Sequence, residues 1–391
     1  MNKFIVNAAN LKHNINFVKS RLNKGVLFCA MVKANAYGHG LKQAAKNIQN
    51  EADYFGVACV SEGIILRSSN IAKPVLVVGA YDRGAARQGV LNYLTLTLCT
   101  PDDILHLGKI CKKLNMVCDV HIKINTGMNR LGVNNKLIFI KMLNLLKDNM
   151  YVKLKGVFSH FSMSDINQKY TARQNRIFKS YIKLCKQKIT HPLIFHISSS
   201  FAALNYKKYN YDMVRVGLAM YGYGNKNLKP AITIKSEIKA VSFVKKGSLV
   251  GYGGTFKTER DSKIAVIPLG YADGINLKLS NAFKIRVAGR ICAQKFPSNI
   301  EGCPLLPQKV SGRYFLGTPG AGCVISVPVV GRICMDMFMC DVTGTDIKAG
   351  DSVTVFDEQN NAAVWAKICG NHEYEILTSF KTNRMKVIYL K

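Results

Sequence analysis

The sequence predicts a (β/α)8, TIM-like barrel followed by a mostly-β C-terminal domain, and three observations support this fold class. Short apolar runs alternate with segments of helical spacing over roughly the first 220 residues. Beyond that point the segments become short, β-branched and separated by turn residues. Glycines and polar residues follow several of the predicted strands, where such barrels carry their active sites. We expect a barrel domain over residues 1–227 and a β domain over residues 228–391.

The barrel elements follow one another in a regular order after Phe4-Ile5-Val6 and a helix predicted over residues 10–22. Strands are predicted at 26–32, 54–60, 74–79, 94–99, 116–124, 154–161, 193–197 and 213–221. Helices are predicted between them at 41–48, 61–67, 83–91, 101–114, 136–146 and 172–188. A doubly wound sheet is the alternative architecture, but no Gly-x-Gly-x-x-Gly turn follows the first buried strand.

The second half of the chain alternates between short strands and turns. Strands are predicted within 231–244 and at 248–252, 263–267, 283–287, 324–330, 339–342 and 352–356. A stretch rich in proline and glycine, residues 292–329, reads as an insert, and the segment 297–328 alone holds five of the chain's ten prolines. Such segments are usually surface loops.

Composition narrows the class of protein. The 391 residues are 48% hydrophobic and 20% charged, which is ordinary for a globular chain. Neither a membrane span nor a signal peptide is recognisable, so a cytoplasmic location is expected. The twelve cysteines form no Cys-x-x-Cys pair, so no metal site is predicted. The net charge of +32 comes from lysines spread along the chain without a recognisable basic helix, which predicts no specific nucleic-acid partner.

Lys33 is the first candidate for chemistry. The apolar run 26–32 ends in this lysine, which places its stem in an apolar wall and its amine at the end of a buried strand. Burial lowers a lysine pKa and makes the neutral, nucleophilic amine available for Schiff-base chemistry. The alternative interpretation is a lysine that merely extends its ammonium group from the strand end into water.

A Schiff-base lysine requires a partner, and pyridoxal 5'-phosphate is the cofactor that this chemistry favours. Its phosphate needs backbone N–H groups and hydroxyls. Two stretches at later strand ends offer both, His196-Ile197-Ser198-Ser199-Ser200 and the segment from Arg215 to Gly222.

Eight short motifs together resemble the alanine racemase family in composition and in order. They are residues 32–40 (Val-Lys-Ala-Asn-Ala-Tyr-Gly-His-Gly), 125–132, 159–161, 215–222, 251–256, 270–274, 331–336 and the pair Tyr374-Glu375. The resemblance spans nearly the whole chain. It implies a barrel plus a β domain in a head-to-tail homodimer with shared active sites.

The activity that the resemblance implies is the interconversion of L-alanine and D-alanine, which supplies D-alanine for peptidoglycan. Lys33 would hold the cofactor and act as one acid/base at the substrate α-carbon. Tyr252 of the other subunit would act on the opposite face. Racemisation requires two such groups, because a proton leaves one face of a planar carbanion and returns on the other. A phenol is a weak base at neutral pH unless positive neighbours stabilise its anion.

The remaining roles are carried over by position. His160 and Arg215 resemble the hydrogen-bonded chain that leads to the tyrosine, and Arg215 would also face the pyridine nitrogen and discourage its protonation. Arg130 and the backbone of Met335 would bind the substrate carboxylate, and Tyr271 resembles a tyrosine at the entrance. The phosphate would be bound by Tyr37, Ser200, Gly217, Leu218 and Tyr374.

Two departures lie beside the substrate arginine. Asn125 stands where the family usually has aspartate, and Asn129 where glycine is common. Family members often carry a carbamylated lysine at the position of Lys123, so the loss of the acid leaves carbamylation here open. The insert at 292–329 is also longer than in most members. A racemase of broader specificity, acting for instance on serine, and a non-catalytic cofactor-binding protein remain alternatives.

Overall fold

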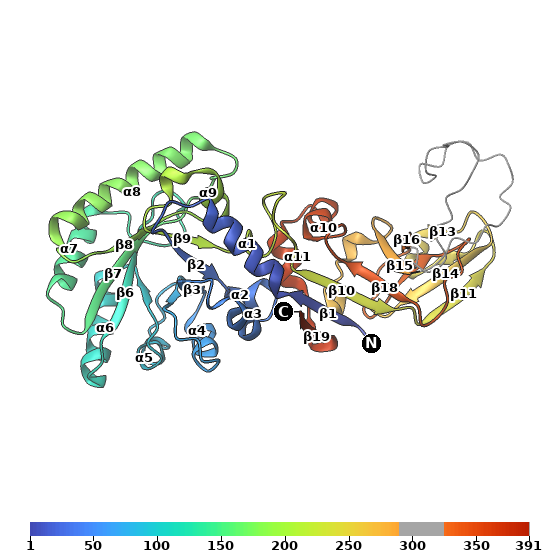
Figure 1. Ribbon diagram of the computed structural model, residues 1–391, viewed down its shortest axis with the longest axis horizontal. Coiled ribbons are helices and arrows are strands. Elements are labelled where there is room, and N and C mark those ends of the chain that lie inside the picture. Colours follow the sequence, from blue (N-terminus) through green and yellow to red (C-terminus); the bar gives the residue numbers. More distant parts are fainter. Residues whose placement is uncertain (289–323, 391) are drawn as a thin grey trace. The chain divides into compact units, whose positions relative to one another are not determined.

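The computed structural model describes residues 1–288 and 324–390. The chain divides into two compact units (Figure 1). The barrel unit comprises Val6–Ala231 with Tyr389–Lys391, and the β unit comprises Met1–Ile5 with Ile232–Ile388. Each unit has its own sheet and core, and each is described separately below.

The barrel unit contains eight parallel strands. They form two arcs, β4-β3-β2-β9 and β5-β6-β7-β8. Backbone hydrogen bonds from Val77 to Thr95 (2.9 Å) and from Asp212 to Phe195 (3.0 Å) connect the two arcs. The predicted (β/α)8 barrel is therefore confirmed. Its strands are β2 (Leu27–Met31), β3 (Tyr54–Val57), β4 (Val75–Val77), β5 (Leu96–Leu98), β6 (Cys118–Lys123), β7 (Val152–Phe158), β8 (Ile194–His196) and β9 (Met213–Val216).

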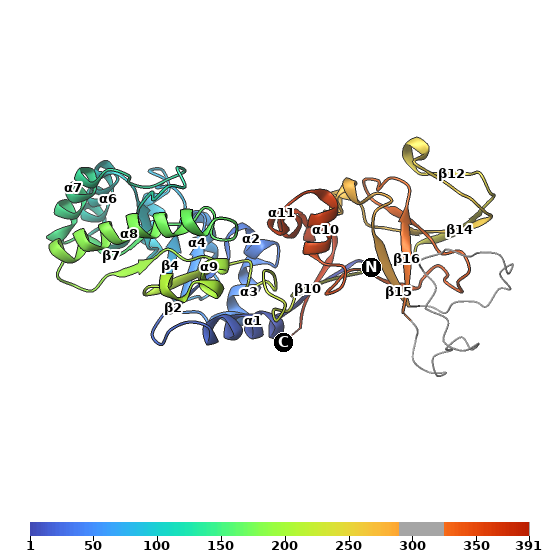
Figure 2. The ribbon, with the colours of Figure 1, turned by 90° about the horizontal axis from the view of Figure 1, so that it is seen from above.

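Helices cover the outside of the barrel strands (Figures 1 and 2). They are α1 (Ala8–Ser20), α3 (Leu41–Ile48), α4 (Val60–Arg67), α5 (Ala86–Leu91), α6 (Pro101–Leu114), α7 (Lys136–Lys147), α8 (Gln168–Lys188) and α9 (Ser200–Asn205). Side-chain caps fix several starts: Asn7, Asn135 and Asn167 accept from the first turns of α1, α7 and α8. Thr100 and Asp103 form a capping box at α6. None of the helices in the described residues combines the length and apolarity of a membrane span.

Helix α8 corrects one expectation from the sequence. Its 21 residues contain no acidic side chain. Its buried face includes Phe178 and Tyr181, whereas the exposed positions carry a row of basic side chains at helical spacing, namely Lys169, Arg173, Arg176, Lys179, Lys183 and Lys186. The prediction that the chain has no basic helix was wrong, because the polar face of this helix is basic while its core face is apolar.

The β unit is built on one nine-stranded sheet in the order β11-β14-β17-β16-β15-β18-β10-β1-β19. The strands are β1 (Lys3–Asn7), β10 (Ile232–Glu237), β11 (Ala240–Val244), β14 (Ser262–Ile267), β15 (Lys284–Ala288), β16 (Val324–Val330), β17 (Phe338–Asp341), β18 (Ser352–Phe356) and β19 (Lys386–Leu390). A hairpin of β12 (Leu249–Val250) and β13 (Phe256–Lys257) stands beside it. The mostly-β character predicted for this half of the chain is confirmed.

The predicted insert at 292–329 overlaps one of these strands. Residues 324–329 belong to β16, which pairs antiparallel with β15 from Ala288↔Val324 to Lys284↔Pro328. The strand predicted at 324–330 is confirmed, because this β-branched run pairs across a sheet despite containing Pro328. The overlapping expectation of a loop that extends to residue 329 was wrong for residues 324–329. The rest of the predicted insert, residues 292–323, lies outside the described residues.

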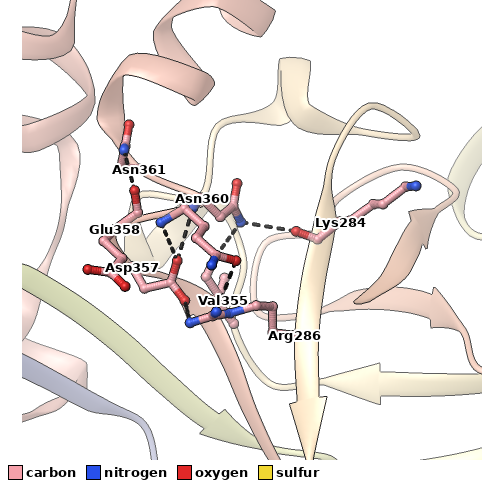
Figure 3. A network of polar contacts seen from close by, with 8 residues as sticks. Lys284, Arg286, Val355, Asp357, Glu358, Asn360 and Asn361 are labelled. Carbon is pink, nitrogen blue, oxygen red and sulfur yellow. Dashed lines mark hydrogen bonds and ion pairs between the residues drawn. The ribbon is translucent and has the colours of Figure 1, made fainter. Parts of the chain in front are cut away.

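Two helices of the β unit, α10 (Ala362–Cys369) and α11 (Glu373–Ser379), were not predicted. The strand β18 leads into α10 through a polar network (Figure 3). Asp357 pairs with Arg286 of β15, and Asn360 donates to the carbonyls of Lys284 (3.0 Å) and Val355 (2.7 Å). The Asn360 amide oxygen accepts from the indole of the fully buried Trp365 (2.9 Å). One asparagine thus connects β15, β18 and α10.

We expect Asn360→Ala to lower the free energy of unfolding by about 1–3 kcal/mol, because it leaves an indole N–H and two carbonyls without their partner. Urea unfolding followed by tryptophan fluorescence measures this, since Trp365 is the only tryptophan. Gln359→Ala, which removes one exposed contact to Arg286, is the control and should change stability by less than about 0.5 kcal/mol. Equal effects of the two changes would contradict the role of Asn360.

Candidate active site

The chain leaves β2 in a left-handed turn that presents Lys33. The four residues after the lysine have positive φ angles: 51° at Ala34, 53° at Asn35, 53° at Ala36 and 52° at Tyr37. Left-handed backbone costs roughly 1–2 kcal/mol for each residue that has a Cβ. A turn of this kind persists only where its surroundings hold it, and such strain is typical of functional sites.

Glu62, near the start of α4, supplies the main anchor of this turn. Its carboxylate accepts from the backbone N–H of Ala34 (2.6 Å) and from that of Ala58 at the end of β3 (2.7 Å). The Asn35 side chain accepts from the N–H of Leu41 (2.8 Å), which joins the turn to α3. The Tyr389 hydroxyl donates to the carbonyl of His39. Glu62 was not identified from the sequence, although an acid opening the helix after the second buried strand was a possible signal.

The environment of Lys33 lowers the pKa of its amine. Burial is the largest cause that lowers the pKa of Lys33, and the positive charges of Arg130 and Arg215 lower it further. The negative charge of Glu62 acts in the opposite direction. The expectation of a lysine at the end of a buried strand agrees with its position two residues after β2.

A group of hydroxyls and loop N–H groups lies beside this turn. The Ser200 hydroxyl accepts from the backbone N–H groups of Gly217 (3.1 Å) and Ala219 (3.2 Å). A Cβ at Gly217 would stand 2.6 Å from the hydroxyl of Tyr37, so only glycine lets this tyrosine reach the loop after β9. Tyr37 also packs against Tyr221, with ring centroids 4.9 Å apart. Tyr37, Ser200, Gly217 and Leu218 are therefore brought together, and their role as a phosphate site stays a prediction.

Arg215, on β9, is the buried cation of the site. Its guanidinium donates to the carbonyl of Ser159 (2.7 Å) and contacts Nδ1 of His160 (3.0 Å) and of His196 (2.7 Å). Burial lowers the pKa of Arg215 to about 10, which still leaves it charged at neutral pH. Burial, followed by the charge of Arg215, lowers the pKa of His160 well below its ordinary value. His160 is therefore a neutral acceptor from Arg215.

Asn125 and Asn129, the two residues of the loop after β6 that differ from the usual family pattern, bond to each other. Asn129 has a φ angle of 56°, a conformation that asparagine tolerates better than most residues other than glycine. The Asn125 side-chain oxygen accepts from the N–H groups of Gly127 and Asn129, both at 3.0 Å. Its NH₂ group donates to the Asn129 side-chain oxygen (3.1 Å), which a carboxylate at position 125 could not do. The pair holds the loop that carries the exposed Arg130 without adding a negative charge.

Lys123, at the end of β6, lies among these cations with only 7% of its surface exposed. Burial, followed by the charges of Arg215 and Arg130, lowers the pKa of Lys123 to about 8. The mouth of the barrel thus gathers Lys33, Lys123, Arg130 and Arg215 with few acids among them. Such a field attracts anionic groups of a ligand.

The β unit brings together its own candidate residues. Tyr252 begins a 3-10 turn (Tyr252–Gly254) and is 72% exposed. The backbone N–H groups of Tyr271 and Ala272 donate to the carbonyls of Cys334 (3.1 Å) and Met335 (3.0 Å). Asn281 connects the segments 251–256 and 331–336. Its side chain accepts from the N–H of Gly331 (2.6 Å) and donates to the hydroxyl of Thr255 (3.2 Å).

The predicted site residues thus fall into two groups. The barrel unit holds Lys33, Tyr37, Arg130, His160, Ser200, Arg215, Gly217 and Leu218. The β unit holds Tyr252, Tyr271, Met335 and Tyr374, the last on α11.

Comparisons with known proteins agree with this division. The family described as the alanine racemase N-terminal domain matches residues 6–225, and the alanine racemase C-terminal domain matches residues 231–303 and 321–389. Alanine racemase from Thermodesulfovibrio yellowstonii is 34% identical over 394 residues, covering 97% of this chain and 96% of that protein. Alanine racemase 2 from Caldanaerobacter subterraneus subsp. tengcongensis is 32% identical over 371 residues, covering 92% and 87%.

Solved structures give the same answer. The structure of alanine racemase from Clostridium difficile 630 superposes with a TM-score of 0.83 at 30% identity and covers 99% of this chain and 95% of its own. Fold and site define an enzyme of the class that combines a (β/α)8 barrel with a β domain. The chain belongs to the alanine racemase family.

We expect Glu62→Ala to lower the free energy of unfolding by about 2–4 kcal/mol, because two backbone N–H groups lose a charged acceptor and the left-handed turn loses its anchor. Glu62→Gln keeps one carbonyl oxygen and should lose less. Ser61→Ala, at the neighbouring exposed position, is the control for the helix start. Urea unfolding followed by circular dichroism measures all three. A Glu62→Ala variant as stable as Ser61→Ala would show that the turn holds itself.

Lys123 generates a pH-dependent prediction. Its folded pKa of about 8 lies below the ordinary 10.5, so the unfolded chain binds this proton more tightly. The buried Lys123 therefore lowers the free energy of unfolding by its full amount below about pH 8, and this loss disappears as the pH rises towards 10.5. Lys123→Met should be more stable than the parent at pH 7, by roughly 1–3 kcal/mol, and this advantage should shrink towards pH 10.

Urea unfolding at pH 7, 8.5 and 10 measures this difference. Lys153→Met, at an exposed position of β7, is the control and should show no such trend. A stability difference between Lys123→Met and the parent that stays constant with pH would contradict the lowered pKa.

Proposed function

We propose that this protein is an alanine racemase that uses pyridoxal 5'-phosphate to interconvert L-alanine and D-alanine, with D-alanine destined for peptidoglycan. The observation that carries the proposal is that the barrel unit holds a lysine with a lowered pKa, a serine hydroxyl bonded to two loop N–H groups and a buried arginine. Family membership supports the choice of reaction and of substrate.

The residues present fit the cofactor. Its phosphate would be bound by the Ser200 hydroxyl, the backbone of Gly217 and Leu218, and the Tyr37 hydroxyl, where the absence of a side chain at Gly217 leaves room. We assign Tyr374 of the β unit to the same group. Arg215 would face the ring nitrogen. Because a guanidinium only donates hydrogen bonds and remains charged, it would keep that nitrogen unprotonated. When bound, the cofactor supplies an electron sink for the electron pair left at the α-carbon.

Two side chains would move the proton. The amine of Lys33, whose pKa is lowered by burial, would take or return it on one face of the α-carbon. Tyr252 of the partner subunit would serve the opposite face in a homodimer with shared active sites. His160, held neutral beside Arg215, would connect the positive charge of the arginine to that tyrosine. The barrel domain would thus bind the cofactor, and the β domain would provide the second base.

The substrate would be oriented by its carboxylate. Arg130 lies on a loop fixed by Asn125 and Asn129, and it contributes to the positive field at Lys33. The backbone of Met335 of the partner subunit would complete the carboxylate site. Carbamylation of Lys123 stays open; with a pKa of about 8 its amine is partly neutral at physiological pH.

The test combines a spectrum with an exchange assay on the full chain loaded with pyridoxal 5'-phosphate. We expect a visible absorption band that Lys33→Ala abolishes, and exchange of the alanine α-proton with solvent deuterium from both enantiomers, followed by NMR. Lys33→Ala should slow exchange by about 10²- to 10⁴-fold. Tyr252→Phe should slow exchange from one enantiomer more than from the other, because each base serves one face. Tyr93→Phe, at an exposed tyrosine of the barrel unit, is the control. Absence of α-proton exchange in the loaded protein would refute the racemase function.

A further inference from the structure

A line of polar side chains crosses the interior of the barrel behind Arg215. The guanidinium of Arg215 on β9 contacts Nδ1 of His196 on β8 at 2.7 Å. The Nε2 atom of His196 contacts Nδ1 of His121 on β6 at 2.8 Å. All three side chains are buried. Neither His196 nor His121 has a role in the proton transfers described above.

The chemistry of arginine fixes the direction of both hydrogen bonds. A guanidinium has donors and no acceptor, so Nδ1 of His196 must accept and cannot carry a proton. A neutral His196 then carries its proton on Nε2, which donates it to Nδ1 of His121. His121 in turn must carry its own proton on Nε2. Burial, followed by the charge of Arg215, lowers the pKa of both histidines, which agrees with two neutral rings.

The barrel interior makes room for His121. A Cβ at Gly156 on β7 would stand 2.6 Å from Cε1 and 2.8 Å from Nδ1 of the His121 ring. The pairing of β6 with β7 shifts register between Val120 and His121. On the other side, the His196 ring stacks on Phe158 with centroids 4.8 Å apart and an interplanar angle of 6°. The positions of both imidazole rings are therefore fixed by packing, that of His121 against Gly156 and that of His196 against Phe158.

One nitrogen of the His121 ring does not contribute a hydrogen bond within the described residues. This atom, Nε2, is buried. An unpaired buried donor is unfavourable, so the Nε2–H group of His121 itself does not stabilise the fold. The hydrogen bond that distinguishes a histidine from an apolar residue at this position is the one that its Nδ1 atom accepts from His196.

We propose that His121 is a positioning residue for Arg215. Its Nδ1 atom keeps the proton of His196 on Nε2, so that Nδ1 of His196 always accepts from the guanidinium. Without that acceptor, His196 can move its proton to Nδ1 or rotate, and Arg215 loses one of its fixed partners. The consequence for the reaction rests on the proposed racemase function, whereas the proton positions do not.

The first experiment is NMR of the full chain labelled with ¹⁵N-histidine, without added cofactor, from pH 5 to 8. The His121→Asn and His196→Asn variants assign the signals. We expect both histidines to be neutral with the proton on Nε2 throughout this range. A proton on Nδ1 of His196, or a charged state of either ring, would overturn the proposal. Because this readout needs no activity, it remains decisive if the racemase function fails.

The second experiment compares His121→Leu with His121→Asn in the cofactor-loaded enzyme. The asparagine oxygen can accept from His196, whereas leucine of similar size cannot. His121→Leu removes the unpaired N–H of His121 but leaves the Nε2–H of His196 without its acceptor. We therefore expect His121→Leu and His121→Asn to have similar thermal stability. We expect His121→Leu to lower kcat about 10-fold with little change in KM, and His121→Asn to recover most of the loss.

Equal loss of kcat in the two variants would mean that the ring acts only by packing and would overturn the proposal. If the leucine variant fails to accumulate as folded protein, the asparagine variant and the wild-type NMR spectra decide. If His121→Asn retains kcat and both wild-type rings carry their proton on Nε2, the positioning role of His121 is supported. Loss of kcat in His121→Asn overturns it.

Discussion

A positive charge buried among parallel strands is the constraint on which the barrel site depends. Arg215 is 4% exposed, and a guanidinium in such a place requires an acceptor for each donor that faces the protein. Backbone carbonyls after β7 and β8 and two histidines meet this need. Because arginine cannot accept, His160 and His196 keep their contacts with it only while their Nδ1 atoms are unprotonated. The charge of one residue thus determines the proton positions of its neighbours, and it lowers the pKa of Lys33 and Lys123 at the mouth of the barrel.

The same electrostatic logic explains the loop after β6. An aspartate at position 125 would add a negative charge beside Arg130 and Lys123. Asparagine keeps the two backbone acceptor contacts of that position and uses its NH₂ group to hold Asn129 in a left-handed conformation. The two substitutions therefore preserve the shape of the loop while making the site more positive.

Much of this arrangement was predictable from the sequence, and the reasons are local. The helices predicted at 41–48 and 101–114 have strong apolar periodicity, and their bounds agree with those of α3 and α6. Lys33, Ser200 and Gly217 were found because their motifs carry the chemistry themselves. Glu62, His121 and His196 act through distant backbone or side-chain atoms, which no sequence pattern reports. Helices α10 and α11 were missed because the surrounding short strands dominated the pattern. The basic face of α8 was missed because its basic residues are separated by apolar ones along the sequence.

The left-handed turn after β2 also bears on the order of folding. Its backbone is unfavourable in isolation, and its supports come from distant parts of the chain: Glu62 on α4, Tyr221 after β9, whose hydroxyl donates to the carbonyl of Met31 (3.0 Å), and Tyr389 near the C-terminus. Local sequence alone therefore does not hold the segment 33–37 in this conformation; contacts with residues distant in the chain hold it. The backbone that presents the lysine therefore forms together with the closed barrel, so Lys33 reaches the buried environment that lowers its pKa only in the folded unit.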